Sequence, residues 1–175
     1  MKRPVLRTEL CEMLGIEYPI LSAGMGPTLI GENTGAPVEL VVAVSEAGGM
    51  GVLGGSGFTV DELRDAIRQI KAQTDKPFGV DLLLPQKIDF DGGMGNKDVD
   101  ELPLSEVLKG IPKSHMEWVN KIRDEMNLPE TELMVRMNTT TMRPKESVEV
   151  CLEEKVPLFC AGLGNPGFMV DDAHK

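Results

Sequence analysis

Aromatic residues are scarce in this sequence, and long hydrophobic runs are missing. Phe, Trp and Tyr together make up 4% of the chain, which holds one Trp and one Tyr. We expect some of its 11 Met residues to fill core volume that aromatic rings otherwise occupy. No run of about 18 apolar residues exists, so no transmembrane helix is expected. The N-terminus has basic residues but no apolar stretch after them, so no secretory signal is expected either.

Cysteine is also rare, and basic residues are outnumbered. The three cysteines, Cys11, Cys151 and Cys160, are odd in number and lack the short spacing of metal ligands. They therefore predict neither a metal site nor a disulfide framework, and we expect reduced thiols, as in cytoplasmic proteins. The net charge of −10 disfavours nucleic acid and anionic membranes as partners, because both repel an acidic surface.

Glycine, by contrast, follows two predicted strands near the start of the chain. Residues 18–26 read YPILSAGMG, and residues 47–54 read AGGMGVLG. A strand that ends in small residues lets a backbone approach a flat ligand closely. Two such ends in succession are typical of neighbouring strands in a β/α barrel whose active-site ends are aligned.

Strands and helices alternate along most of the chain, which predicts an α/β fold. We expect four strands, at 18–23, 50–53, 78–84 and 156–161. They should lie adjacent and parallel in that order, because βα units follow right-handed crossovers. Thr59 and Glu62 form a capping box before a helix with one apolar stripe. The third strand is apolar on both faces except at Asp81, which we expect at the open end of the strand or hydrogen-bonded.

Residues 85–142 break this alternation. The stretch 89–100 is acidic and glycine-rich and is typical of a loop. A second capping box at Ser114 and Glu117 predicts a helix start. We therefore expect a mostly helical insertion after the third strand, within a single domain of residues 1–175. A closed (β/α)8 barrel typically needs about 250 residues, so the 175 residues predict only part of one.

Five short stretches, taken in order, resemble the nitronate monooxygenase family. They lie at 14–20, 23–25, 45–51, 76–82 and 156–166. The resemblance implies the N-terminal part of an FMN-binding (β/α)8 TIM barrel. It also implies a flavoprotein oxidoreductase, a monooxygenase that oxidises alkyl nitronates with oxygen. The flavin-dependent enoyl reductases share much of the same pattern, and inosine monophosphate dehydrogenases share less.

The same resemblance implies four flavin contacts. In this family the flavin meets the backbone at the end of the first strand, which corresponds to Ala23, Gly24 and Met25. It also meets a polar side chain at the end of the third strand, which is usually Asn and here is Asp81. An ionised Asp only accepts hydrogen bonds, and it repels a reduced, anionic flavin.

No catalytic residue is expected in this chain. The family's catalytic histidine comes from a later strand, and neither His115 nor His174 lies in matching sequence. The loops that bind the FMN phosphate also belong to later strands. We therefore expect an incomplete enzyme that is inactive alone. Two alternatives stay open: an enoyl reductase-like protein, or a non-catalytic half-barrel that pairs with another chain, for example as a homo-oligomer that covers its open sheet edges.

Three minor features have competing interpretations. Gly48 and Gly49 are better explained as a helix C-cap than as a ligand contact. The glycine-rich loop 54–57 offers amides that could hold a phosphate, but a plain loop is favoured. Glu153 and Glu154 are interpreted as a solvated helix face.

Overall fold

The protein has an α/β fold built on a parallel sheet. The computed structural model describes residues 6–26, 38–84, 112–127 and 144–175. Its sheet has three strands in the order β1-β2-β3: β1 (Gly51–Gly54), β2 (Phe78–Leu83) and β3 (Leu158–Gly162). The described helices are α1 (Glu9–Leu14), α2 (Val38–Glu46), α3 (Val60–Gln73), α5 (Lys113–Glu125), α7 (Pro144–Glu153), the 3₁₀ helix η2 (Pro166–Phe168) and α8 (Val170–Ala173).

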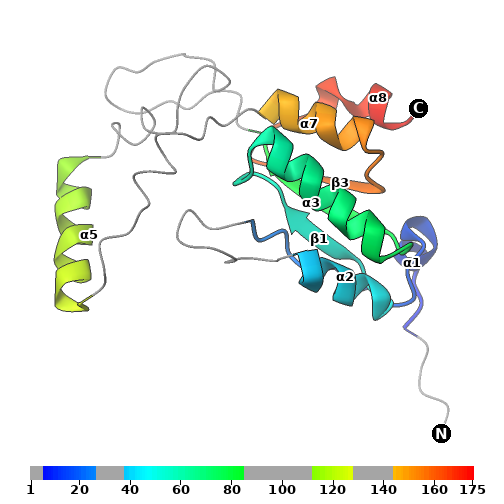
Figure 1. Cartoon of the computed structure of the whole chain (residues 1–175), viewed down its shortest axis with the longest axis horizontal. Coiled ribbons are helices and arrows are strands. Elements are labelled where there is room, and N and C mark those ends of the chain that lie inside the picture. Colours follow the sequence, from blue (N-terminus) through cyan, green and yellow to red (C-terminus); the bar gives the residue numbers. More distant parts are fainter. Residues whose placement is uncertain (1–5, 27–37, 85–111, 128–143) are drawn as a thin grey trace, which may run out of the picture.

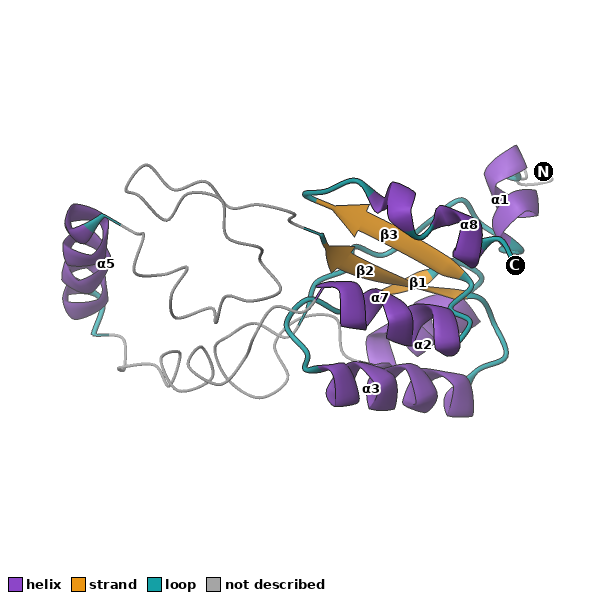
Figure 2. Cartoon of the chain, turned by 90° about the horizontal axis from the view of Figure 1, so that it is seen from above, coloured by secondary structure: helices purple, strands orange, loops and turns teal. Residues whose placement is uncertain are grey.

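Helices α2, α3 and α7 cover one face of the sheet (Figure 1 and Figure 2). Alternate side chains of β2, from Phe78, Val80 and Leu82, are buried against these helices. In α3 the apolar stripe of the sequence is buried as predicted, with Leu63 and Ile67 fully inaccessible to solvent. Because side chains alternate across a strand, the residues between them face the opposite side of the sheet.

Several helix ends follow local sequence rules. The predicted capping box before α3 is present: the Thr59 amide donates to the Glu62 carboxylate, and the Glu62 amide donates to Thr59 Oγ1. Gly15 ends α1 and Gly48 follows α2, both with positive φ, of 68° and 92°. The second predicted capping box is wrong. Helix α5 begins at Lys113 after Pro112, and no side chain caps it.

Ser45 joins the end of α2 to two strands. Its buried hydroxyl donates to the Pro77 carbonyl at 2.9 Å and accepts from the Gly51 amide at 3.0 Å. These two bonds pair polar backbone groups at the entrances to β1 and β2. One side chain therefore sets the position of α2 against the amino ends of both strands.

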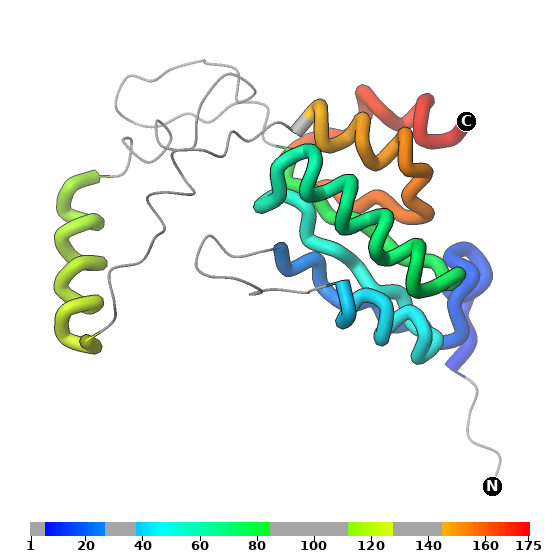
Figure 3. The backbone as a smooth tube through the Cα atoms, in the orientation of Figure 1, coloured from blue at the N-terminus to red at the C-terminus, as the bar shows by residue number. Residues whose placement is uncertain are grey.

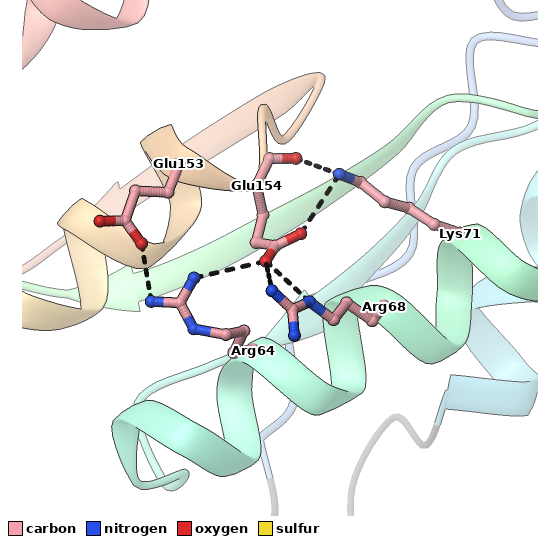
Figure 4. Close-up of polar contacts among 5 residues, drawn as sticks. All are labelled: Arg64, Arg68, Lys71, Glu153 and Glu154. Atoms are coloured by element: carbon pink, nitrogen blue, oxygen red, sulfur yellow. Dashed lines mark hydrogen bonds and ion pairs between the residues drawn. The ribbon is translucent and has the colours of Figure 1, made fainter.

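An ion-pair cluster joins α3 to the end of α7 (Figure 4). The Glu154 carboxylate lies 2.9 Å from Arg68, 3.3 Å from Arg64 and 3.6 Å from Lys71. Arg64 also contacts Glu153 at 2.7 Å. The prediction of a solvated face is confirmed for Glu153, whose side chain is 61% exposed, and is wrong for Glu154, whose side chain is only 12% exposed. Burial would raise the pKa of Glu154, but Arg68 and the other two cations hold it below its usual value.

Three of the four predicted strands are confirmed as adjacent and parallel. Gly51 pairs with Phe78 and Gly79 with Leu158, in register along both ladders. The first predicted strand, 18–23, is wrong as a regular strand. Among the described residues, it pairs with the β1 side of the sheet through isolated parallel bridges rather than a ladder: Leu21 pairs with Met50, just before β1, and Met25 pairs with Leu53.

The predicted insertion is described only in part. Of residues 85–142, the stretch 112–127 is described and holds α5, which stands apart from the sheet in both views (Figure 1 and Figure 2). The glycine-rich loop at 89–100 lies outside the described residues. At the other end of the chain, β3 is followed by the short helices η2 and α8. None of the helices in the described ranges is long and apolar enough to cross a membrane.

Candidate functional site

The candidate site lies at the carboxyl end of the sheet, on the face opposite the helices. Asp81 is the polar residue of β2 that points to this face. Its register partners are Gly54 on β1 and Cys160 on β3. Because parallel strands end at the same edge, the three positions form one row across the sheet. Sequence parity alone places Asp81 on this face, since Val80 and Leu82 are buried against the helices.

The segment after Leu21 crosses the end of β1 and reaches Asp81. The N-terminal segment is the dark blue stretch of the tube in Figure 3. Four residue steps from Leu21 to Met25 face three steps from Met50 to Leu53, so the segment holds one extra residue. Such an extra residue makes a chain bulge away from its partner strand. This bulge brings the Gly24 backbone onto Asp81.

Gly24 touches Asp81 so closely that no side chain fits between them. A Cβ atom at Gly24 would lie 2.4 Å from the Asp81 Cβ and 2.8 Å from Oδ2. The structure therefore brings the four predicted flavin contacts together on one surface. We call Ala23, Gly24, Met25 and Asp81 the rim.

Gly54 allows this crossing by lacking a side chain. A Cβ atom there would lie 2.1 Å from the Gly26 nitrogen and 2.5 Å from the Met25 carbonyl carbon. The space beside Gly54 is thus occupied by the backbone of Met25 and Gly26. The expectation that a ligand approaches both glycine-bearing strand ends is therefore wrong at Gly54, where the backbone of Met25 and Gly26 fills the space. The first glycine-bearing end, at Gly24, lies on the rim.

Asp81 is a partly buried carboxylate with no counter-charge among the described residues. Its side chain makes no hydrogen bond or ion pair within residues 6–26, 38–84, 112–127 and 144–175. Burial raises the pKa of Asp81 above its usual value. Burial, and then the charge of Asp81, raise the pKa of the Cys160 thiol. The charge of Asp81 therefore acts on the neighbouring thiol without a compensating cation among the described residues.

The loop 54–57 is a structural turn. The Gly55 amide donates to the Asp81 carbonyl at 2.8 Å, and Ser56 Oγ accepts from the Leu83 amide at 2.7 Å. These bonds tie the loop to β2, which supports the plain-loop interpretation over a phosphate cradle.

The exposed part of the rim suits a flat, largely apolar ligand. Met25 is 62% exposed and Leu83, beyond Asp81 on the same strand face, is 39% exposed. A planar ring could lie on these side chains and present a polar N–H to the Asp81 carboxylate, which only accepts. A metal ion has no comparable site, since no group of three or more His, Cys, Asp or Glu side chains gathers in the described part of the chain.

The two histidines lie elsewhere and are exposed. His115 belongs to α5 and His174 follows α8, so neither reaches the rim. Cys160 lies beside Asp81 in the strand register and was not among the site residues predicted from the sequence. Side chains alternate along β3, and Phe159 packs on the core, so Cys160 lies on the same face of the sheet as Asp81.

Comparison with known proteins gives two kinds of relative. The sequence profile of the family described as nitronate monooxygenase matches residues 7–175. A probable nitronate monooxygenase from Staphylococcus haemolyticus is 29% identical over 158 residues, which are 90% of this chain and 37% of that protein. A (3aS,4S,5R,7aS)-5-hydroxy-7a-methyl-1-oxo-octahydro-1H-indene-4-carboxyl-CoA dehydrogenase from Mycobacterium tuberculosis is 47% identical over 77 residues, which are 44% of this chain and 20% of that protein.

Among solved structures, FabK from Thermotoga maritima is similar in fold. The TM-score is 0.54 at 27% sequence identity, over 95% of this chain and 35% of FabK. The chain thus spans less than two fifths of the length of each of these relatives. The profile match covers nearly all of the sequence, and the chain belongs to the nitronate monooxygenase family.

Proposed function

We propose that this chain is the flavin-ring-binding part of an FMN-dependent oxidoreductase of nitronate monooxygenase type. The observation that carries the proposal is the contact between Gly24 and Asp81, which joins the segment of Ala23, Gly24 and Met25 to a residue far away in sequence. Sites of β/α barrels lie at the carboxyl ends of their strands, which is where this surface lies. The proposed architecture is therefore the N-terminal part of a (β/α)8 barrel.

The residues of the rim fit an isoalloxazine ring in shape and in hydrogen bonding. Met25 and Ala23 are exposed and apolar, as the ring's flat face requires. The ring's pyrimidine edge carries an N–H donor, and the Asp81 carboxylate is a matching acceptor. When bound, FMN would supply the electron transfer between a nitronate and oxygen. The chain's own residues would orient the ring and exclude water from one side of it.

The described residues offer the FMN phosphate little. The amide of Gly55 and the hydroxyl of Ser56 are already hydrogen-bonded to β2. Phosphate recognition through amides and charge-assisted bonds is a large share of flavin affinity. We therefore expect the 175-residue chain to bind FMN weakly and, lacking a histidine at the rim, to show no nitronate oxidation by itself.

Fluorescence quenching of FMN tests the proposal with a matched pair of variants. Met25 on the rim and Met13 on α1 are both exposed, by 62% and 78%. We expect the wild type to bind FMN with a dissociation constant above about 1 μM, which corresponds to less than about 8 kcal/mol. Met25→Glu should weaken binding at least about tenfold, because it places a charge against the ring, and Met13→Glu should leave it unchanged.

Three outcomes would count against the proposal in different ways. Equal binding by both variants would show that the rim is not the site. Absence of quenching at millimolar FMN would refute the flavin. A submicromolar dissociation constant, or turnover of propionate-3-nitronate above background, would show that this chain alone holds a complete site.

The 47% identity with the Mycobacterium tuberculosis dehydrogenase favours a second candidate function, oxidation of a carboxyl-CoA thioester. Anaerobic bleaching of the bound flavin distinguishes the two, since the true substrate reduces it and the other does not. The enoyl reductase alternative predicts bleaching by NAD(P)H instead. Pairing with a second chain stays a further prediction, and light scattering of the purified protein would measure it.

A further inference from the structure

We propose that Asp81 makes this site bind oxidised flavin more tightly than reduced flavin, and so lowers the reduction potential of the bound cofactor. The inference rests on the proposed function, because it needs a flavin ring on the rim. It goes further by assigning Asp81 a role in tuning the cofactor rather than only in holding it.

Asp81 lies next to the backbone that the ring would touch. Its Oδ2 atom lies so close to Gly24 that the carboxylate and the Gly24 backbone border the same surface. Any planar ligand that touches the Gly24 backbone must therefore lie near this carboxylate. The neighbouring strand position on β1 is Gly54, so no side chain of β1 stands between them.

Asp81 has no counter-charge among the described residues. Within the described segments, the neighbours of Asp81 include the Gly24 backbone, Gly54 on β1 and Cys160 on β3. Only Cys160 can ionise, and its raised pKa keeps it neutral near pH 7. The negative charge of the Asp81 carboxylate therefore acts on a ligand without a neighbouring positive charge to offset it.

The charge of the flavin ring changes on reduction. Two-electron reduction with uptake of one proton adds a negative charge to the ring system, whereas the oxidised ring is neutral. A partly buried carboxylate interacts with such a charge more strongly than one in bulk water, because the effective dielectric constant is lower. Asp81 thus accepts a hydrogen bond from either form but repels only the reduced one.

Anaerobic equilibrium dialysis with FMN, first oxidised and then reduced with dithionite, measures the effect directly. The readout is the ratio of the dissociation constants for reduced and oxidised FMN, which does not depend on catalysis and tolerates weak binding. Asp81→Asn removes the charge and keeps the shape. Asp81→Glu keeps the charge, and Asp61→Asn makes the same charge change on the exposed first turn of α3.

We expect the ratio to fall at least about tenfold in Asp81→Asn, which corresponds to a rise of about 30 mV for a two-electron couple. Asp81→Glu and Asp61→Asn should keep the wild-type direction of preference. An unchanged ratio in Asp81→Asn, with oxidised FMN still bound, would overturn this inference and leave the proposed function standing. Absence of FMN binding by the wild type would overturn both.

Discussion

Adding a methyl group at Gly24 should break the contact on which the candidate site depends. The new Cβ atom would lie 2.4 Å from the Asp81 Cβ. Carbon atoms in contact are normally about 3.5–4.0 Å apart, so the segment must move by more than about 1 Å. Overpacking of this kind costs about 1–3 kcal/mol of unfolding free energy. We also expect the displaced segment to weaken FMN binding.

A double-mutant cycle with Asp81→Gly isolates this contact. Removing the Asp81 side chain gives the new methyl group room, so Gly24→Ala should cost less in that background. We expect a coupling energy of about 1–2 kcal/mol, within the range for residues in contact. Gly15→Ala is the matched control: a Cβ atom there meets nothing within 4 Å, although φ is 68°. It should cost about 1 kcal/mol of backbone strain and show no coupling to Asp81→Gly.

Urea denaturation followed by far-UV circular dichroism gives the four free energies. With an m-value of about 2 kcal/mol/M, a cost of about 2 kcal/mol shifts the midpoint by about 1 M, which is readily measured. Additive costs of Gly24→Ala and Asp81→Gly, within about 0.5 kcal/mol, would refute the packing of the bulge on β2. Coupling in the Gly15 control of the same size would show a general effect of Asp81→Gly instead.

Two further substitutions test how the scaffold holds this edge. Ser45→Ala leaves the Gly51 amide and the Pro77 carbonyl unpaired, and should cost about 2–4 kcal/mol of unfolding free energy in urea denaturation. The control Ser56→Ala removes a single exposed bond and should cost under about 1 kcal/mol. Equal costs would contradict the bridging role of Ser45. Glu154→Gln should cost about 1 kcal/mol, less at high salt, because Arg68 and Lys71 lose their carboxylate partner and Arg64 keeps only Glu153. Folding lowers the pKa of Glu154, so the stability difference between wild type and Glu154→Gln should be complete above the unfolded-state pKa of Glu154. It should vanish as pH falls through the folded-state pKa. A stability difference that persists in acid would contradict this.

Local patterns were sufficient to predict most of the secondary structure. The capping box of α3 and the glycine after α1 act through neighbouring backbone groups, so they are legible in a few residues. The same rule misled at Ser114, because Pro112 already fits a helix start and α5 needs no side-chain cap. The segment 18–23 was misread because its hydrophobic run indicates burial, not whether the ladder is continuous.

Sequence by itself determined the parallel βα frame, the apolar stripe of α3 and the isolation of one carboxylate, Asp81, in an apolar strand. These follow from side-chain periodicity and from resemblance to a family. Only the tertiary structure decided what surrounds that carboxylate. The extra residue between Leu21 and Met25 swings Gly24 onto it, and strand register sets Cys160 beside it. Such contacts depend on where two distant backbones cross, and neither segment encodes that crossing alone. The same holds for Glu154, whose three partners come from a helix more than 80 positions earlier in the chain.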